Sequence, residues 1–308
     1  MTLKKLDYID LPEHRSAGGF DHADVHAPTD RLYVAHTGND ALDVIDCAKD
    51  CYLESVPGLT GVAGALVSEA RGLVFTSNRG ENTISMFAPH DERNAFKIAV
   101  GVKPNGLAFD PARGILLAAN IGDQSIAGSH TVSVVDVARR MRVGDIEVAG
   151  ATRWAIFDPV REMFFINISS PPRIIAIDAR DPTRVSKEYE IPVAGPHGLD
   201  LDPASGRLLC ACDAGVLLTI DADSGRVLDE CPLSGTPDVI FLNLQLRRLY
   251  VAIGDPGVID VIDMATMRRA EVVPTEAGAH TTALDRKRNK LYAFLPRSHR
   301  AAVFQDSN

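Results

Sequence analysis

A single unit recurs seven times along the 308-residue chain, and this repeat restricts the possible folds more than any other feature. In its clearest copy, a turn at Pro196–Gly198 leads into an alternating strand, Leu199–Asp202, and then into an apolar strand, Leu208–Ala211. A third strand ends on an acidic turn, and a fourth, more polar strand ends near a glycine. Four short strands at a period of about forty residues are typical of a β-propeller blade. We therefore predict an all-β fold, a seven-bladed β-propeller of four-stranded antiparallel blades, as a single domain over residues 1–308.

The two ends of the chain predict how the ring closes. The seventh copy supplies strands at His280–Asp285, Lys290–Leu295 and Ala301–Gln305, and no fourth strand follows. The N-terminal stretch Leu3–Pro12 resembles a fourth strand that lacks a blade. Pairing these two segments would join the first blade to the last and leave no open seam. We expect the N-terminal strand to complete the last blade.

Composition excludes several classes of protein. A net charge of −9 disfavours binding to nucleic acid or to an anionic membrane surface, which favour basic proteins. The first residues lack the apolar core of a secretory signal, and no apolar stretch is long enough to span a bilayer. The five cysteines show neither zinc-finger nor disulfide-framework spacing. These features predict a cytoplasmic protein without nucleic-acid or membrane partners, and the closed ring predicts a monomer.

One residue before the first strand of each copy takes an equivalent place at the predicted mouth of the central channel. In chain order these residues are His22, Ala63, Asn105, Arg153, His197, Asp238 and His280. The alignment allows a shift of one residue in the first and fourth copies, where Asp21 or Trp154 would take the place. Three of the nine histidines occupy this one kind of position. Four of the places are consecutive once the ring closes and carry ligand-type side chains: His197, Asp238, His280 and His22.

Three imidazoles and a carboxylate directed at one axis predict a site for a divalent transition metal. This donor set suits Zn, Fe, Cu, Ni or Mn better than Ca or Mg. On the opposite arc, Arg153 and Asn105 are candidates to orient an anionic small-molecule substrate, because guanidinium binds carboxylate or phosphate in a bidentate manner. Glu81 and His36, in loops predicted on the same face, are the candidate general acid and base. The alternative is that these polar side chains only line a solvated pore.

Three segments resemble the repeats of a known family. Arg31–Thr37, Lys103–Asp110 and Arg248–Ala252 are similar to the YVTN-repeat seven-bladed β-propellers, and more distantly to lactonase-type and streptogramin-lyase-type propellers. The resemblance covers essentially the whole chain. By analogy it implies metal-dependent hydrolysis of a lactone or ester. Lactonase-type propellers hold their cation with Glu, Asn and Asp, and this histidine-rich set departs from that pattern. Lyase or metal-oxygen chemistry, and a non-catalytic propeller that binds a ligand or metal, are the alternatives.

Overall fold

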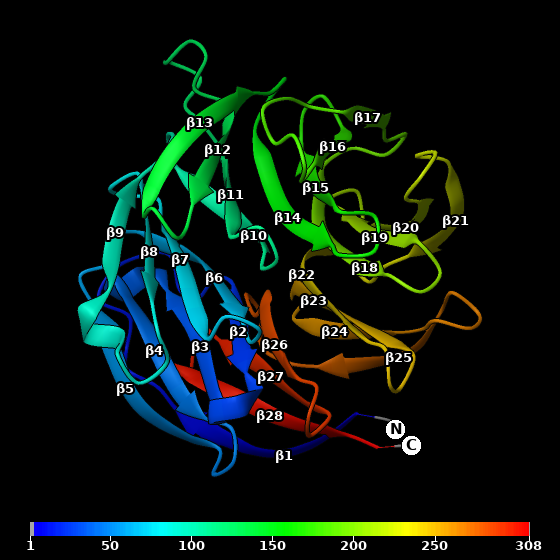
Figure 1. The fold of residues 1–308 in the computed structure, drawn as a ribbon. Helices are drawn as coiled ribbons and strands as arrows, with labels where there is room; N and C mark the ends of the chain where they lie inside the picture. The colour runs from blue at the N-terminus through cyan, green and yellow to red at the C-terminus, as the bar shows by residue number, and fades with distance from the viewer. Residues whose placement is uncertain (1–2, 308) are drawn as a thin grey trace.

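The computed structural model describes residues 3–307 and confirms a seven-bladed β-propeller (Figure 1). Seven antiparallel four-stranded sheets stand around a central axis, and the inner strands of neighbouring blades contact one another in order, with β26 beside β2. Residues 3–307 contain three short 3-10 helices, η1 (Ala27–Thr29), η2 (Thr37–Asn39) and η3 (Glu92–Asn94). In this part of the chain, none of the helices has the length and apolar character needed to span a membrane.

The strands follow each blade from the axis outward, in the order of the chain. Blade one comprises β2 (Ala23–His26), β3 (Arg31–His36), β4 (Ala41–Asp46) and β5 (Cys51–Pro57); blade two β6 (Val62–Ser68), β7 (Leu73–Asn78), β8 (Thr83–Phe87) and β9 (Phe96–Ala99); blade three β10 (Pro104–Asp110), β11 (Ile115–Asn120), β12 (Thr131–Asp136) and β13 (Met141–Glu147). Blade four comprises β14 (Thr152–Asp158), β15 (Met163–Ile168), β16 (Arg173–Asp178) and β17 (Lys187–Glu190); blade five β18 (Pro196–Asp202), β19 (Arg207–Cys212), β20 (Val216–Asp221) and β21 (Val227–Pro232); blade six β22 (Thr236–Asn243), β23 (Arg248–Asp255), β24 (Val258–Asp263) and β25 (Arg268–Pro274).

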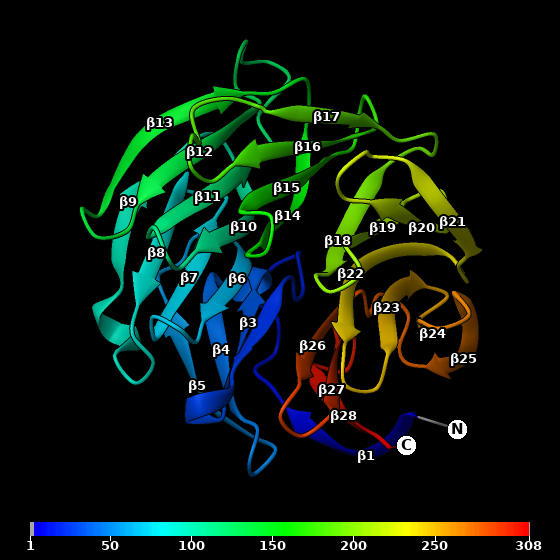
Figure 2. The same ribbon diagram turned by 45° about the vertical axis from the view of Figure 1, so that its right-hand side comes forward.

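Blade seven joins the two ends of the chain, as the sequence predicts. It contains β26 (Thr281–Asp285), β27 (Lys290–Leu295), β28 (Arg300–Asp306) and, outermost, β1 (Leu3–Asp10). Strand β1 runs antiparallel to β28, and the two ends of the chain lie side by side (Figures 1 and 2). The closed ring leaves no unpaired edge between the first and last blades.

A tyrosine on the second strand of three blades ties that blade to the next one around the ring. Tyr33, Tyr250 and Tyr292 are fully buried, and each hydroxyl donates to a carboxylate of the following blade. The Tyr33 hydroxyl lies 3.0 Å from Glu92, and the Tyr292 hydroxyl lies 2.7 Å from Asp50. The basic residue two positions earlier contacts the same carboxylate in each case, because alternate residues of a strand share one face. The Arg-Leu-Tyr and Lys-Leu-Tyr motifs therefore join blades six, seven, one and two.

Candidate functional site

In most blades, a β-bulge at the start of the inner strand turns one side chain toward the mouth of the channel. In blade five, Pro196 pairs with Cys212 and Gly198 pairs with Ala211, which leaves His197 without a partner. The register shifts at the equivalent place in blades two, three, four and six. Bulges re-aim side chains and are common next to active sites.

The strand pairing shows which of two residues, Asp21 or His22, takes the equivalent position in blade one. The first regularly paired residue after the bulge is Ala23 in blade one, and its equivalent in blade five is Leu199. Counting back two residues places Asp21 level with His197. The prediction of His22 for this place is therefore wrong by one residue, because two residues of the bulge face a single residue of β3.

In blade four, the first regularly paired residue after the bulge is Ala155. Counting back two residues from it confirms Arg153 as the equivalent of His197. Trp154 lies one position deeper, at the level of His22. The two rings pack against each other across the channel in a tilted arrangement, with centroids 4.1 Å apart and an interplanar angle of 39°. His22 is 6% exposed, and burial lowers its pKa, so it is neutral at pH 7. His22 and Trp154 form the floor of the mouth.

Arg79 supplies the polar group that blade two lacks. The residue of that blade at the equivalent position, Ala63, is small, and Arg79 follows β7 of the same blade. Its guanidinium donates to Asp21 at 2.8 Å and also to the side-chain oxygen of Asn105. Burial alone would raise the pKa of Asp21, but the charge of Arg79 holds this pKa below its usual value. Asp21 is therefore a carboxylate, and one cation ties blades one, two and three together.

The other arc of the mouth is a row of two histidines and two aspartates. His197 Nδ1 lies 2.7 Å from Asp213 Oδ1, and His197 Nε2 lies 3.3 Å from Asp238 Oδ1. His280 Nδ1 donates to the carbonyl oxygen of Gly278 at 2.8 Å, and its Nε2 lies 3.9 Å from Asp238 Oδ2. Both imidazoles therefore present Nε2 to the same carboxylate, Asp238.

Arg153 faces this row without a partner of its own. Among residues 3–307, no hydrogen bond or ion pair of its guanidinium is found, and its Nε is buried without an acceptor. Its charge is close enough to lower the pKa of His197, against the opposite effect of Asp238 and Asp213. A guanidinium without a carboxylate partner at the mouth is available to a ligand anion.

The two residues predicted as general acid and base lie outside this ring of contacts. Glu81 forms an ion pair with Lys97 at 2.7 Å, on the outer strand β9. His36 is fully buried, with Nδ1 2.7 Å from Asp43 and Nε2 2.6 Å from His14. Neither side chain contacts Arg153, Asn105 or the histidines of the mouth in the described part of the chain.

Sequence reasoning missed Arg79 and Asp213 as parts of the site. Each is the first residue after the second strand of its blade, following β7 and β19. A comparison of the seven copies at that position, in addition to the bulge, would have identified both as charged residues near the mouth.

The structure brings together three of the four predicted metal ligands. His197, Asp238 and His280 are neighbours, whereas His22 lies deeper and packs against Trp154. Within residues 3–307, no three His, Cys, Asp or Glu side chains are already placed around one point as metal ligands are. A metal at this row would therefore require these side chains to move.

Comparison with known proteins defines the class of this chain as a seven-bladed β-propeller and no more. No protein-family model and no curated protein sequence matches it. Among solved structures, hydrazine synthase of Kuenenia stuttgartiensis is 15% identical over 96% of each chain, with a TM-score of 0.81. A chain of the mitotic checkpoint complex is 10% identical over 99% of this chain and 92% of that one, with a TM-score of 0.83. Likeness at these identities concerns the fold alone. YVTN-repeat membership, the monomeric state, the cytoplasmic location and the partner classes stay predictions.

Proposed function

We propose that the channel mouth is the active site of a metal-dependent enzyme acting on a small, polar, anionic compound. The observation that carries this proposal is the orientation of His197 and His280. Each Nδ1 is engaged by an acceptor, the Asp213 carboxylate or the Gly278 carbonyl, and each Nε2 faces Asp238. Metal-ligating histidines usually donate their other ring N–H to a carboxylate or a backbone carbonyl in this way.

Two distances in the row can be compared with those of a metal centre. With zinc bonds of about 2.0–2.1 Å to nitrogen and oxygen, two ligand atoms of a tetrahedral site lie about 3.4 Å apart. His197 Nε2 is already 3.3 Å from Asp238, whereas His280 Nε2, at 3.9 Å, has to move closer. Three protein ligands leave a fourth position for water or substrate, as in catalytic zinc sites.

Arg153 and Asn105 would hold the substrate. Arg153 has no internal partner, whereas Arg79 is already engaged by Asp21. A carboxylate of the substrate bound to Arg153 would stand beside His197. The metal would polarise a carbonyl group or supply hydroxide, so lactone or ester hydrolysis is the first reaction to test.

A lyase in which His197 carries the proton without a metal is the second candidate. Burial lowers the pKa of His197, but Asp238 and Asp213 outweigh this effect and raise the pKa above its usual value. Asp213 also fixes the orientation of the ring. A histidine held in this way can transfer a proton at neutral pH.

The experiment starts with elemental analysis of untagged protein after loading with Zn, Mn, Fe(II), Ni or Cu and removal of free metal. We expect about one equivalent of metal in the wild type, and its loss in His197→Ala and His280→Ala, because each variant removes one of three ligands. His90→Ala is the matched control, since His90 is exposed and lies outside the mouth. Metal content below about a quarter of an equivalent, unchanged by these substitutions, contradicts the metal proposal.

A panel of lactones, esters and hydroxy acids then separates the functions. Turnover that requires metal and is lost in Asp238→Ala supports the metal-dependent enzyme. Turnover without metal that is lost in His197→Gln supports the lyase. Binding of a panel compound without turnover supports a non-catalytic binding protein.

A further inference from the structure

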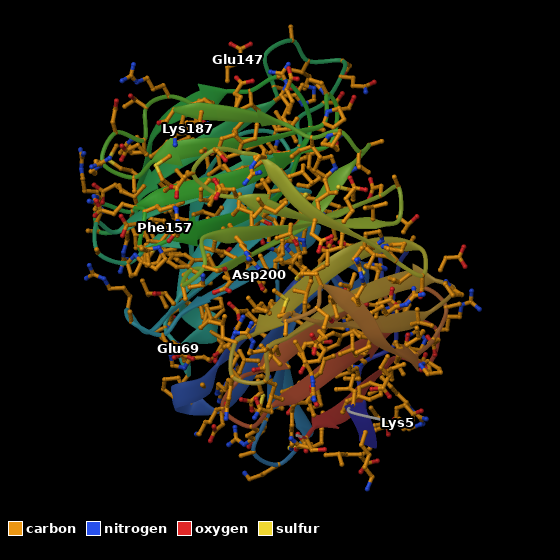
Figure 3. All side chains as sticks on the ribbon, turned by 90° about the vertical axis from the view of Figure 1, so that its right-hand side faces the viewer. Lys5, Glu69, Glu147, Phe157, Lys187 and Asp200 are labelled. Carbon is orange, nitrogen blue, oxygen red and sulfur yellow. The ribbon has the colours of Figure 1, made fainter. Side chains whose placement is uncertain are left out.

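A cavity lies beneath the floor of the mouth, within the central channel. It has a volume of about 500 Å³, and His22 and Trp154 border its inner end. Its far end is bordered by turns between the inner and second strands, which carry Glu69 and Arg286. In Figure 3, Asp200 lies near the centre of the view, whereas Glu69 and Phe157 lie toward its left side.

The wall of this cavity is mainly apolar and includes three phenylalanines. Its main apolar side chains are Leu107, Phe109, Phe157, Leu199, Leu201 and Phe241. The residues of the mouth row, His197, Asp238 and His280, are not among those that border it. The cavity is therefore chemically and spatially distinct from the proposed active site.

Two carboxyl groups interrupt this apolar wall at one equivalent position of the inner strands. The pairing of each inner strand with the second strand of its blade shows which residues are equivalent. Five blades carry an apolar residue at this position: Leu66, Ala108, Ile156, Phe241 and Ala283. Blades one and five instead carry Asp24 and Asp200. The fold therefore does not require a carboxylate at this position.

Neither carboxylate has an ion-pair partner in residues 3–307. Asp24 accepts backbone N–H groups of Val25 and Val67 at 2.8 Å, and Asp200 accepts those of Leu201 and Leu242 at 2.7 Å. These bonds link each inner strand to the next and use one lone pair of each oxygen, since a carboxylate oxygen can accept twice.

The charge around these groups is only partly balanced. Burial raises the pKa of Asp24 to about 6 and also raises the pKa of Asp200. Arg286 opposes both shifts from the rim, where it is exposed and its guanidinium carbon lies 5.9 Å from the centroid of the Phe241 ring. Glu69 adds a further negative charge near Asp24. Desolvated carboxylates without a close cation favour a positively charged ligand.

His22 borders the inner end of the cavity. Its side chain is more than nine-tenths buried, and its Nε2 lies 3.4 Å from the Asp21 carboxylate, which favours the proton on Nε2. In the described chain, its Nδ1 has no hydrogen-bond partner. With its proton on Nε2, His22 keeps an acceptor at Nδ1.

We propose that this cavity binds a small apolar organic cation, an arylalkyl- or alkylammonium. The apolar wall would bury the hydrocarbon body, and Asp24 and Asp200 would supply the counter-charge. The phenylalanine faces would add cation–π attraction. An anion of the same shape meets two carboxylates and only one cation, Arg286, so it is disfavoured.

The test is calorimetric titration of the full chain with three probes of matched shape, namely phenethylamine, phenethyl alcohol and 3-phenylpropionate, at mildly alkaline pH. We expect the amine to bind about tenfold more tightly than the alcohol or the acid, because it alone has the complementary charge. Equal binding of amine and alcohol, tighter binding of the acid, or no binding of the amine overturns the proposal.

Two variants locate the site. Asp200→Asn should weaken binding of the amine about tenfold and leave binding of the alcohol unchanged, because only the charge interaction is lost. Arg286→Ala should tighten binding of the amine, since it removes a competing cation from an exposed position at the rim. If Asp200→Asn fails to fold, Arg286→Ala still tests the proposal. Weaker binding of the amine by Arg286→Ala than by the wild type contradicts it.

Discussion

Replacement of Tyr292 by phenylalanine tests the physical account of how the ring is held closed. The Tyr292 hydroxyl is buried on blade seven and donates to Asp50 of blade one at 2.7 Å. The substitution keeps the ring packing and removes one hydrogen bond to a charged acceptor. Such a bond contributes about 1.5–3 kcal/mol, a large part of a total stability of about 5–15 kcal/mol. For a chain of this length, we expect the melting temperature to fall by about 1.5 °C for each kcal/mol lost.

The assay is urea and thermal unfolding of Tyr292→Phe beside a matched control, Tyr8→Phe. Tyr8 is 41% exposed, and its hydroxyl contacts Lys5 on the surface, so we expect its loss to change stability by less than about 0.5 kcal/mol. A double-mutant cycle with Asp50→Asn isolates the contribution of the pair. Equal stability of Tyr292→Phe and Tyr8→Phe, or no coupling in the cycle, would refute the argument that these tyrosines tie the blades.

Three further outcomes follow from the charges of the channel. Arg79→Ala should lower the free energy of unfolding by about 1–3 kcal/mol, because the half-buried Asp21 carboxylate loses its cation. Arg153→Ala should leave stability within about 0.5 kcal/mol, because it has no internal partner, and should raise KM for an anionic substrate. The pKa of Asp24 is raised to about 6 in the folded state, so its contribution to stability is present at acidic pH and is lost as pH rises through about 6. The loss is at most about 3 kcal/mol between pH 4 and 8, and it should be absent in Asp24→Asn when unfolding is followed across this range.

The architecture could be predicted from sequence because it depends on local patterns repeated seven times. Alternating strands, Gly/Pro turns and the orphan segment at Leu3–Pro12 are visible without knowledge of distant contacts. The pairing of β1 with β28 follows from the same count of strands.

The site could be predicted only in part, because side chains from different blades converge there. A bulge of one residue moved the place in blade one from His22 to Asp21, and the alternation of a strand gives no signal for a bulge. Arg79 reaches the mouth from the loop after β7, in the blade whose equivalent position carries Ala63. Glu81 is nearby in sequence but faces Lys97 instead. The direction in which the loop leaves its strand decides whether Arg79 or Glu81 reaches the mouth, and this direction depends on tertiary contacts.

The most direct test of the central claim is X-ray absorption spectroscopy of the zinc-loaded protein. The account predicts a zinc ion with two imidazole nitrogens and a carboxylate oxygen, at about 2.0–2.2 Å, in the wild type and in His90→Ala. Because each of these variants removes one of three ligands, we expect the bound zinc and its imidazole signal to be lost in His280→Ala and in His197→Ala. Zinc surrounded only by oxygen, or an unchanged spectrum in both histidine variants, would contradict it.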